Sequence, residues 1–205
     1  MRAHFVTSAA DLAGRPLPAL PEFAFVGRSN CGKSSLINYF TGQAQLARTS
    51  RDPGRTRLLN YYQTGAGYYL VDLPGYGYAR VSKAERAGWA RLIRAYLADV
   101  GRPLAVFHLL DARHLPSDED AQMSAWLREA ELPFAIAVTK IDKVGAGDRL
   151  GHYRRLIAAL DLPPGTPFIP TSARRRQGRR EMQAWLEERL AAWTPARRPE
   201  TGGQP

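Results

Sequence analysis

Residues 27–34 carry a pattern whose residue types and spacing could hold a chain of phosphates. They read G-R-S-N-C-G-K-S and match G-x-x-x-x-G-K-S/T in full. Glycines let backbone N–H groups turn around a phosphate, and the N-terminus of a following helix adds about half a positive charge. We expect Lys33 to reach the β- and γ-phosphates of a nucleotide and the Ser34 hydroxyl to bind Mg²⁺.

Two further segments could sense the metal and the γ-phosphate. Residues 72–75 read D-L-P-G at the end of a predicted hairpin, where the aspartate can hold Mg²⁺ and the Gly75 N–H can meet the γ-phosphate. The polar stretch 42–56 is predicted to be a loop that relaxes after hydrolysis, with Thr56 as a Mg²⁺ ligand. Thr49, or a plain surface threonine, is the alternative. The predicted metal ligands are therefore Ser34, Thr56 and Asp72, and the predicted catalytic residues are Lys33, Thr56 and Gly75.

Residues 139–142 could select the base. They read T-K-I-D after the apolar run 134–138, which fits the pattern N/T-K-x-D. A carboxylate accepts hydrogen bonds from the N1–H and 2-amino groups of guanine, whereas adenine offers neither donor, so such a site rejects adenine. We expect Asp142 to bind guanine and the stem of Lys140 to pack on the phosphate loop. A backbone N–H in the later segment 171–173, predicted to be that of Ala173, would meet the guanine O6.

These segments, in this order, predict a guanine-nucleotide site. An ATPase or a kinase is the alternative, and Asp142 argues against it. The residues expected to contact the nucleotide are Gly27, Arg28, Ser29, Asn30, Cys31, Gly32, Lys33, Ser34, Ser35, Gly54, Arg55, Thr56, Arg57, Leu58, Asp72, Leu73, Pro74, Gly75, Thr139, Lys140, Ile141, Asp142, Thr171, Ser172 and Ala173.

The elements that position these segments alternate between apolar runs and helical patterns. Strands are predicted at residues 22–26, 58–63, 68–72, 104–110, 134–138 and 166–169, and helices at about 33–40, 82–100, 117–130, 148–160 and 182–193. This alternation predicts an α/β fold, the three-layer αβα sandwich of P-loop NTPases. Its mostly parallel six-stranded sheet would have one antiparallel edge strand. Ligands of such sheets bind beyond the carboxyl ends of the strands, where the four motifs fall.

Length and composition set the domain organisation. The 205 residues suit one domain, and 44% hydrophobic residues exclude a largely disordered chain. We assign residues 1–20 to an N-terminal edge segment, 21–193 to the nucleotide-binding domain and 194–205 to a disordered tail rich in Pro and Gly. A single cysteine, no apolar run of 18 residues and no signal pattern predict a cytoplasmic protein without a membrane partner.

The charge of the chain favours polyanionic partners. Lys and Arg number 29 against 19 Asp and Glu, which gives a net charge of +10. Such a surface attracts RNA or DNA. Residues 174–180 contain five arginines in seven positions, which favours a contact with rRNA phosphates. A solvated loop in an arginine-rich chain is the alternative.

Three longer stretches carry a resemblance to a known family. Residues 27–38 read G-R-S-N-C-G-K-S-S-L-I-N, residues 53–56 read P-G-R-T and residues 72–79 read D-L-P-G-Y-G-Y-A. Over roughly residues 3–193 the chain resembles the EngB family (also called YihA or YsxC) of translation-factor-class, Era-like bacterial GTPases. The resemblance implies a GTP-hydrolysing switch in assembly of the large ribosomal subunit, needed for normal cell division and septation. It also implies Mg²⁺ with GTP or GDP, a large-subunit precursor and rRNA as partners, and a monomer.

Two positions leave the mechanism open. Ras-type enzymes have a glutamine after D-x-x-G that orients the attacking water, whereas this chain has Tyr76. Either another residue positions the water or hydrolysis is slow without a partner. A nucleotide-regulated rRNA-binding module with negligible catalysis is the alternative function. Asn30 either coordinates K⁺, as related GTPases with asparagine here do, or only tolerates a left-handed backbone.

Overall fold

Three buried and mostly apolar strands form the centre of the sheet. They are β2 (Glu22–Gly27), β5 (Leu104–Asp111) and β6 (Phe134–Thr139), which pair in parallel with one another. Their side chains are buried on both faces, because a parallel sheet is covered by helices on each side. The computed structural model describes residues 2–48, 58–77, 83–99, 101–145, 147, 149–162 and 164–193.

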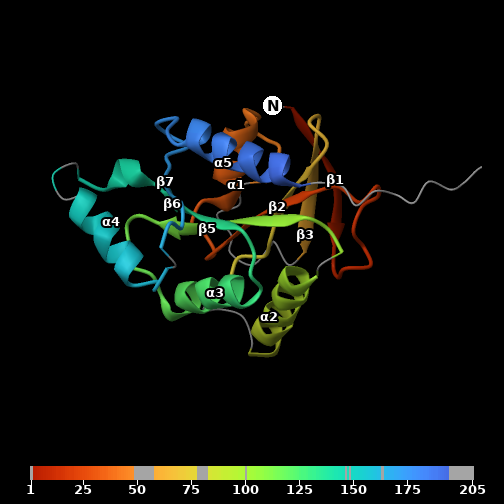
Figure 1. Cartoon of the computed structure of the whole chain (residues 1–205), viewed down its shortest axis with the longest axis horizontal. Coiled ribbons are helices and arrows are strands. Elements are labelled where there is room, and N and C mark those ends of the chain that lie inside the picture. Colours follow the sequence, from red (N-terminus) through yellow and green to blue (C-terminus); the bar gives the residue numbers. More distant parts are fainter. Residues whose placement is uncertain are drawn as a thin grey trace, which may run out of the picture.

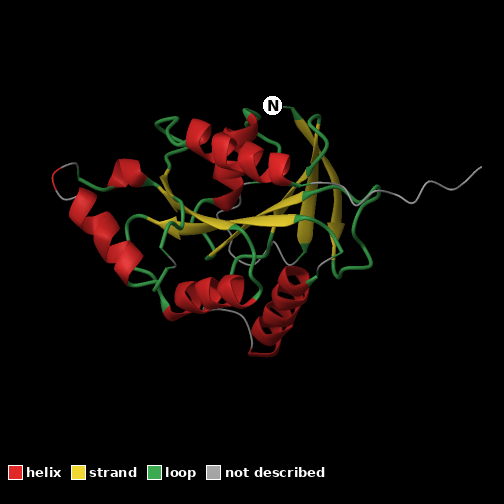
Figure 2. Cartoon of the chain, viewed as in Figure 1, coloured by secondary structure: helices red, strands yellow, loops and turns green. Residues whose placement is uncertain are grey.

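Helices cover both faces of this sheet in three layers (Figures 1 and 2). On one face, α1 (Lys33–Thr41) and α5 (Arg179–Ala192) pack around Phe25 and Phe107. The opposite face carries α2 (Lys83–Ala98), α3 (Asp118–Glu129) and α4 (Arg149–Ala158). The predicted αβα sandwich is confirmed.

The sheet has seven strands, not the six that the sequence predicts. Its order is β1-β3-β4-β2-β5-β6-β7, with β7 at Phe168–Pro170. The hairpin β3 (Leu59–Thr64) and β4 (Tyr69–Asp72) forms as expected, and β1 (Ala3–Ala9) pairs antiparallel with β3. The one antiparallel strand, β3, is therefore inside the sheet rather than at its edge.

Strand β1 was not predictable as a strand because most of its side chains are exposed or only half-buried. Only the two end residues, Ala3 and Ala9, are buried. A residue far from β1 in the sequence binds its first residue. The Gln43 side chain, after α1, accepts from the Ala3 N–H at 2.7 Å and donates to the Ala3 carbonyl at 2.9 Å. Phe5 packs edge-on against Tyr62 of β3.

The predicted start of α3 at Ser117 is confirmed. Ser117 caps α3 and forms a capping box with Asp120, in which each side chain accepts a backbone N–H. The expected cap of α2 at Ser82 lies outside the described residues. Helix α5 begins at Arg179, three residues before the predicted start, so two arginines of the 174–180 run belong to its first turn.

The predicted motifs gather at one edge of the sheet. Strands β4, β2, β6 and β7 run in parallel, and each is followed at its carboxyl end by one of the four segments identified in the sequence. Among the described helices, none has the length and apolar character needed to cross a membrane.

Candidate nucleotide-binding site

Left-handed backbone conformations shape the loop between β2 and α1. Gly32, the N-cap of α1, has φ 111° and Asn30 has φ 63°. No side chain of the described residues caps α1, so its first N–H groups remain available to an anion. The left-handed backbone expected as one alternative for Asn30 is present, and its side chain is exposed.

Lys33 and Gly75 meet beside this loop. Lys33 is buried, and its Nζ lies 3.5 Å from the carbonyl oxygen of Gly27. A Cβ added to Gly75 would lie 3.0 Å from Lys33 Nζ and 3.0 Å from Ser29 N. A side chain at this position would push the Ser29 backbone away by a few tenths of an ångström, so glycine suits this close approach of D-x-x-G to the phosphate loop.

Asp72 lies deep in the site with one oxygen unsatisfied. Its Oδ2 accepts a long hydrogen bond from Ser34 Oγ, at 3.4 Å, and its Oδ1 has no partner in the part of the chain that the structure describes. Burial raises the pKa of this carboxyl, against the attraction of Lys33 and the hydrogen bond from Ser34. A buried carboxylate oxygen without a donor fits a hard divalent cation, and a serine hydroxyl is a suitable second ligand. The two residues thus fit Mg²⁺.

The predicted segment 54–57 lies outside the described residues. The placement of Gly54, Arg55, Thr56 and Arg57, and that of the alternative Thr49, is therefore not described. Leu58 is described and is exposed just before β3.

At the opposite end of the site, Asp142 is held by Ser172. The Ser172 Oγ donates to Asp142 Oδ1 at 2.6 Å, and this hydrogen bond lowers the pKa of the Asp142 carboxyl. Asp142 is therefore ionised at neutral pH, and the Ser172 hydroxyl fixes the orientation of its carboxylate. The same Ser172 oxygen accepts the Arg175 N–H at 3.0 Å, and the Ile141 N–H donates to the Thr171 carbonyl, at 3.3 Å. The T-K-I-D and T-S-A segments are thus adjacent.

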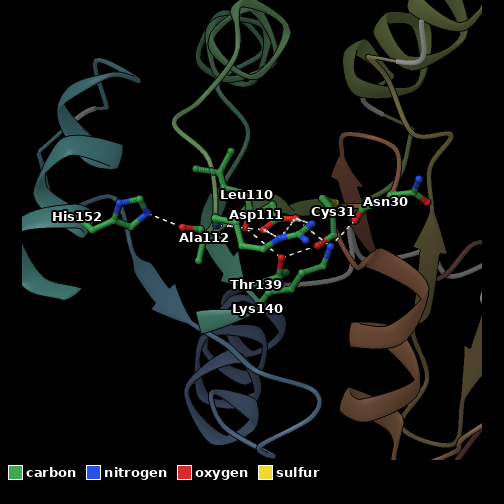
Figure 3. A network of polar contacts seen from close by, with 9 residues as sticks. Asn30, Cys31, Leu110, Asp111, Ala112, Thr139, Lys140 and His152 are labelled. Carbon is green, nitrogen blue, oxygen red and sulfur yellow. Dashed lines mark hydrogen bonds and ion pairs between the residues drawn. The ribbon is translucent and has the colours of Figure 1, made fainter. Parts of the chain in front are cut away.

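Lys140 crosses from β6 to the phosphate loop (Figure 3). Its Nζ donates to the Asn30 carbonyl at 2.6 Å and forms an ion pair with Asp111 Oδ2 at 2.8 Å. Its stem lies 3.7 Å from the position that a Cβ on Gly32 would occupy. The expected packing of Lys140 on the phosphate loop is confirmed. Thr139 adds a second link, because its hydroxyl donates to the Cys31 carbonyl at 2.5 Å.

Asp111 is a site residue that the sequence reasoning missed. It ends β5 and joins Lys140 to Arg113, whose guanidinium pairs with both carboxylate oxygens. Burial would raise the pKa of Asp111, but hydrogen bonds from Arg113 and Lys140 lower it to about 2. An acidic residue at the end of a buried strand was the available signal.

A mostly parallel sheet with a phosphate loop, a D-x-x-G segment and T-K-x-D at its carboxyl edge defines a P-loop GTPase. The family model described as 50S ribosome-binding GTPase matches residues 22–140. The chain belongs to the EngB family. The probable GTP-binding protein EngB of Pelotomaculum thermopropionicum is 44% identical over 88% of this chain and 91% of its own length. That of Desulfitobacterium hafniense is 42% identical over 93% of this chain and 94% of its own length.

Solved structures agree on the fold. A crystal structure of a probable GTP-binding protein EngB has a TM-score of 0.69 at 23% identity and covers 84% of this chain and 100% of that one. A single-residue variant of Aquifex aeolicus Era, bound to GDP and aluminium fluoride, has a TM-score of 0.64 at 20% identity. The match covers 90% of this chain and 60% of that one.

Proposed function

We propose that this chain hydrolyses GTP to GDP and phosphate as a switch in assembly of the large ribosomal subunit. The observation that carries the proposal is the convergence of Lys33, Asp72 and Gly75 on the phosphate loop, with one Asp72 oxygen that has no partner among the described residues. This arrangement suits a triphosphate and its metal. Roles in ribosome assembly, cell division and septation rest on the family.

Each residue has a distinct task in this proposal. Lys33 binds the β- and γ-phosphates, and the Gly75 N–H binds the γ-phosphate. Ser34 and Asp72 hold Mg²⁺, with Thr56 as the proposed third ligand. When bound, Mg²⁺ neutralises charge on the phosphate oxygens. The remaining nucleotide contacts predicted from the sequence belong to the same proposal.

Base selection is tested by exchanging the carboxylate. Calorimetry of the full chain should detect GDP and GTP but not ATP. Asp142→Asn should lose guanine-nucleotide affinity by a factor on the order of 10³ and gain affinity for xanthosine nucleotides, because their 2-oxo group accepts a hydrogen bond. Wild-type binding of ATP and GTP with equal affinity would contradict the assignment.

The exposed arginines of the loop after β7 support an rRNA partner. Arg174, Arg175 and Arg176 are exposed and form no ion pair with any side chain in the described ranges. An antiparallel bridge between Ser172 and Gln177 closes the loop beside the guanine end of the site. Phosphate contacts release counterions, so affinity for large-subunit particles should fall with salt.

A triple change of these arginines to alanine tests that contact. We expect it to weaken binding to large-subunit particles at least tenfold and to reduce the salt dependence. Arg154→Ala on α4 removes another exposed arginine and is the matched control. Equal affinity of the triple variant and the control would favour a solvated loop.

The hydrolysis step has two open features. We infer turnover well below about one per second for the protein alone, with stimulation by the particle, because Tyr76 offers no amide to a water. Multiple-turnover phosphate release with and without particles tests this, and no release in either case would favour an rRNA-binding module without catalysis.

We also propose that Asn30 coordinates K⁺. Equal rates of GTP hydrolysis in potassium and sodium buffers would contradict this role. We propose that the protein acts in the cytoplasm and that it is a monomer.

A further inference from the structure

A buried polar network lies behind the residue that follows D-x-x-G. The Tyr76 hydroxyl is 2.7 Å from Asp120 Oδ1 and 2.8 Å from His108 Nε2. His108 Nδ1 lies 3.2 Å from Ser124 Oγ. His108 and Ser124 are fully buried and Asp120 is 4% exposed. The network joins the D-x-x-G segment to β5 and to the first two turns of α3.

The hydrogen bonds are mutually consistent with a neutral histidine. The Asp120 carboxylate can only accept, so the Tyr76 hydroxyl donates to it, and the Tyr76 oxygen must then accept from His108 Nε2–H. That tautomer leaves His108 Nδ1 to accept from the Ser124 hydroxyl. Burial lowers the pKa of His108 to about 4, against the attraction of Asp120, so the neutral form is the one present at pH 7. Each polar atom on this path has a partner.

The main chain of the same residue is held by the phosphate loop. The Ser29 N–H donates to the Tyr76 carbonyl at 2.8 Å, and Arg28 and Tyr76 form a parallel bridge. The preceding Gly75 lies against Ser29 and Lys33, as described above. The segment is therefore fixed on two sides, by the phosphate loop through its backbone and by α3 and β5 through its side chain.

We propose that Tyr76 is a positioning residue for γ-phosphate recognition. Its hydroxyl, held by Asp120 and His108, fixes the main chain at Gly75 so that the Gly75 N–H lies where the γ-phosphate binds. A glutamine in this position acts on the attacking water, whereas this tyrosine turns its polar end into the protein. The proposal rests on the proposed function, because it concerns the phosphate that distinguishes GTP from GDP.

Tyr76→Phe tests the hydroxyl, because phenylalanine keeps the ring. Calorimetry of the full chain with Mg²⁺ compares GDP with a non-hydrolysable GTP analogue. We expect the affinity for the analogue to fall about tenfold and that for GDP to change less than about twofold, since a hydrogen bond to a charged acceptor is lost and only the analogue carries the γ-phosphate. The kcat for GTP should fall by a similar factor.

Two further variants separate positioning from stability. Tyr69→Phe on β4 removes the hydroxyl of a fully buried tyrosine, which donates to the Pro18 carbonyl at 3.3 Å, and should leave both affinities unchanged. Asp120→Asn replaces the charged acceptor of the Tyr76 hydroxyl by a weaker, neutral one, so it should lower the ratio of analogue affinity to GDP affinity in the wild-type chain. It should add little to Tyr76→Phe, because both changes act on the same hydrogen bond.

The outcomes distinguish the two proposals. If Tyr76→Phe leaves the ratio of analogue affinity to GDP affinity unchanged, the positioning role is overturned. Additive effects of Asp120→Asn and Tyr76→Phe would also overturn it. A wild-type chain that binds neither nucleotide would instead overturn the proposed function.

Discussion

The Asp72 carboxylate is buried at a cost to the stability of the ligand-free protein. It is buried beside Lys33 and Ser34, and one of its oxygens has no hydrogen-bond partner in the described ranges. Burial raises its pKa in the folded protein, so folding favours the protonated carboxyl. This contribution to stability is present at low pH and is lost as the pH rises through the folded-state pKa. At neutral pH a bound cation would offset the cost of the buried charge.

Asp72→Asn should therefore stabilise the ligand-free protein while weakening Mg²⁺-dependent binding. The amide keeps the shape of the side chain and removes the charge. We expect a higher melting temperature without ligand and a loss of GTP affinity, in the presence of Mg²⁺, by a factor on the order of 10². Thermal denaturation and calorimetry with Mg²⁺ or EDTA measure the two effects. A lower melting temperature of the variant would contradict this account.

Asp111 has the opposite pH dependence. Arg113 and Lys140 overcome the effect of burial and lower its pKa to about 2, so its contribution to stability is present above the ordinary pKa of the carboxyl and is lost as the pH falls toward 2. Asp111→Asn should cost about 2 kcal/mol of unfolding free energy at pH 7. The difference from the wild type should shrink between pH 4 and pH 2, as urea unfolding across this range can measure.

At the level of the elements, an ion pair far from the site joins β2 to the region after α2. Glu22 is 2% exposed and accepts from Tyr96 Oη on α2 and from Arg102, each at 2.8 Å. It begins β2, whereas the phosphate loop follows the other end of that strand. Stability and nucleotide binding are therefore separable along one strand.

Glu22→Gln should destabilise the fold without changing the site. It leaves the Arg102 guanidinium, 11% exposed, without its counter-charge, which costs about 3–5 kcal/mol. Glu129→Gln is the matched control, because its pair with Arg94 is exposed and 3.7 Å long, and its loss should cost less than about 1 kcal/mol. Urea unfolding measures both, and GDP affinity at a temperature where each variant is folded should equal that of the wild type.

On the scale of the whole molecule, the strand order brings distant segments onto one ligand. The phosphate loop follows β2, D-x-x-G follows β4, T-K-I-D follows β6 and T-S-A follows β7, all at the same edge of the sheet. Bound nucleotide would contact the segments that follow four strands and would so couple the unfolding of those strands.

Mg²⁺-GDP should therefore stabilise the entire domain. At a concentration of about 1,000 times its dissociation constant, the ligand should add about 4 kcal/mol to the unfolding free energy. Hydrogen exchange should slow in β2, β4, β6 and β7 together. Protection confined to the phosphate loop and α1 would contradict the coupling, and ATP at the same concentration is the control.

The contiguous motifs and the elements around them were determined by the sequence itself. The turn at Gly32, the T-K-x-D motif that ends at Asp142 and the buried strands each depend on neighbouring residues, so periodicity and residue type are sufficient to predict them. The tertiary structure decided the contacts between distant residues. Tyr76 meets Asp120, Lys140 meets Asp111 and β1 meets β3 because the strand order and the helix packing place them together, and no local pattern encodes that order.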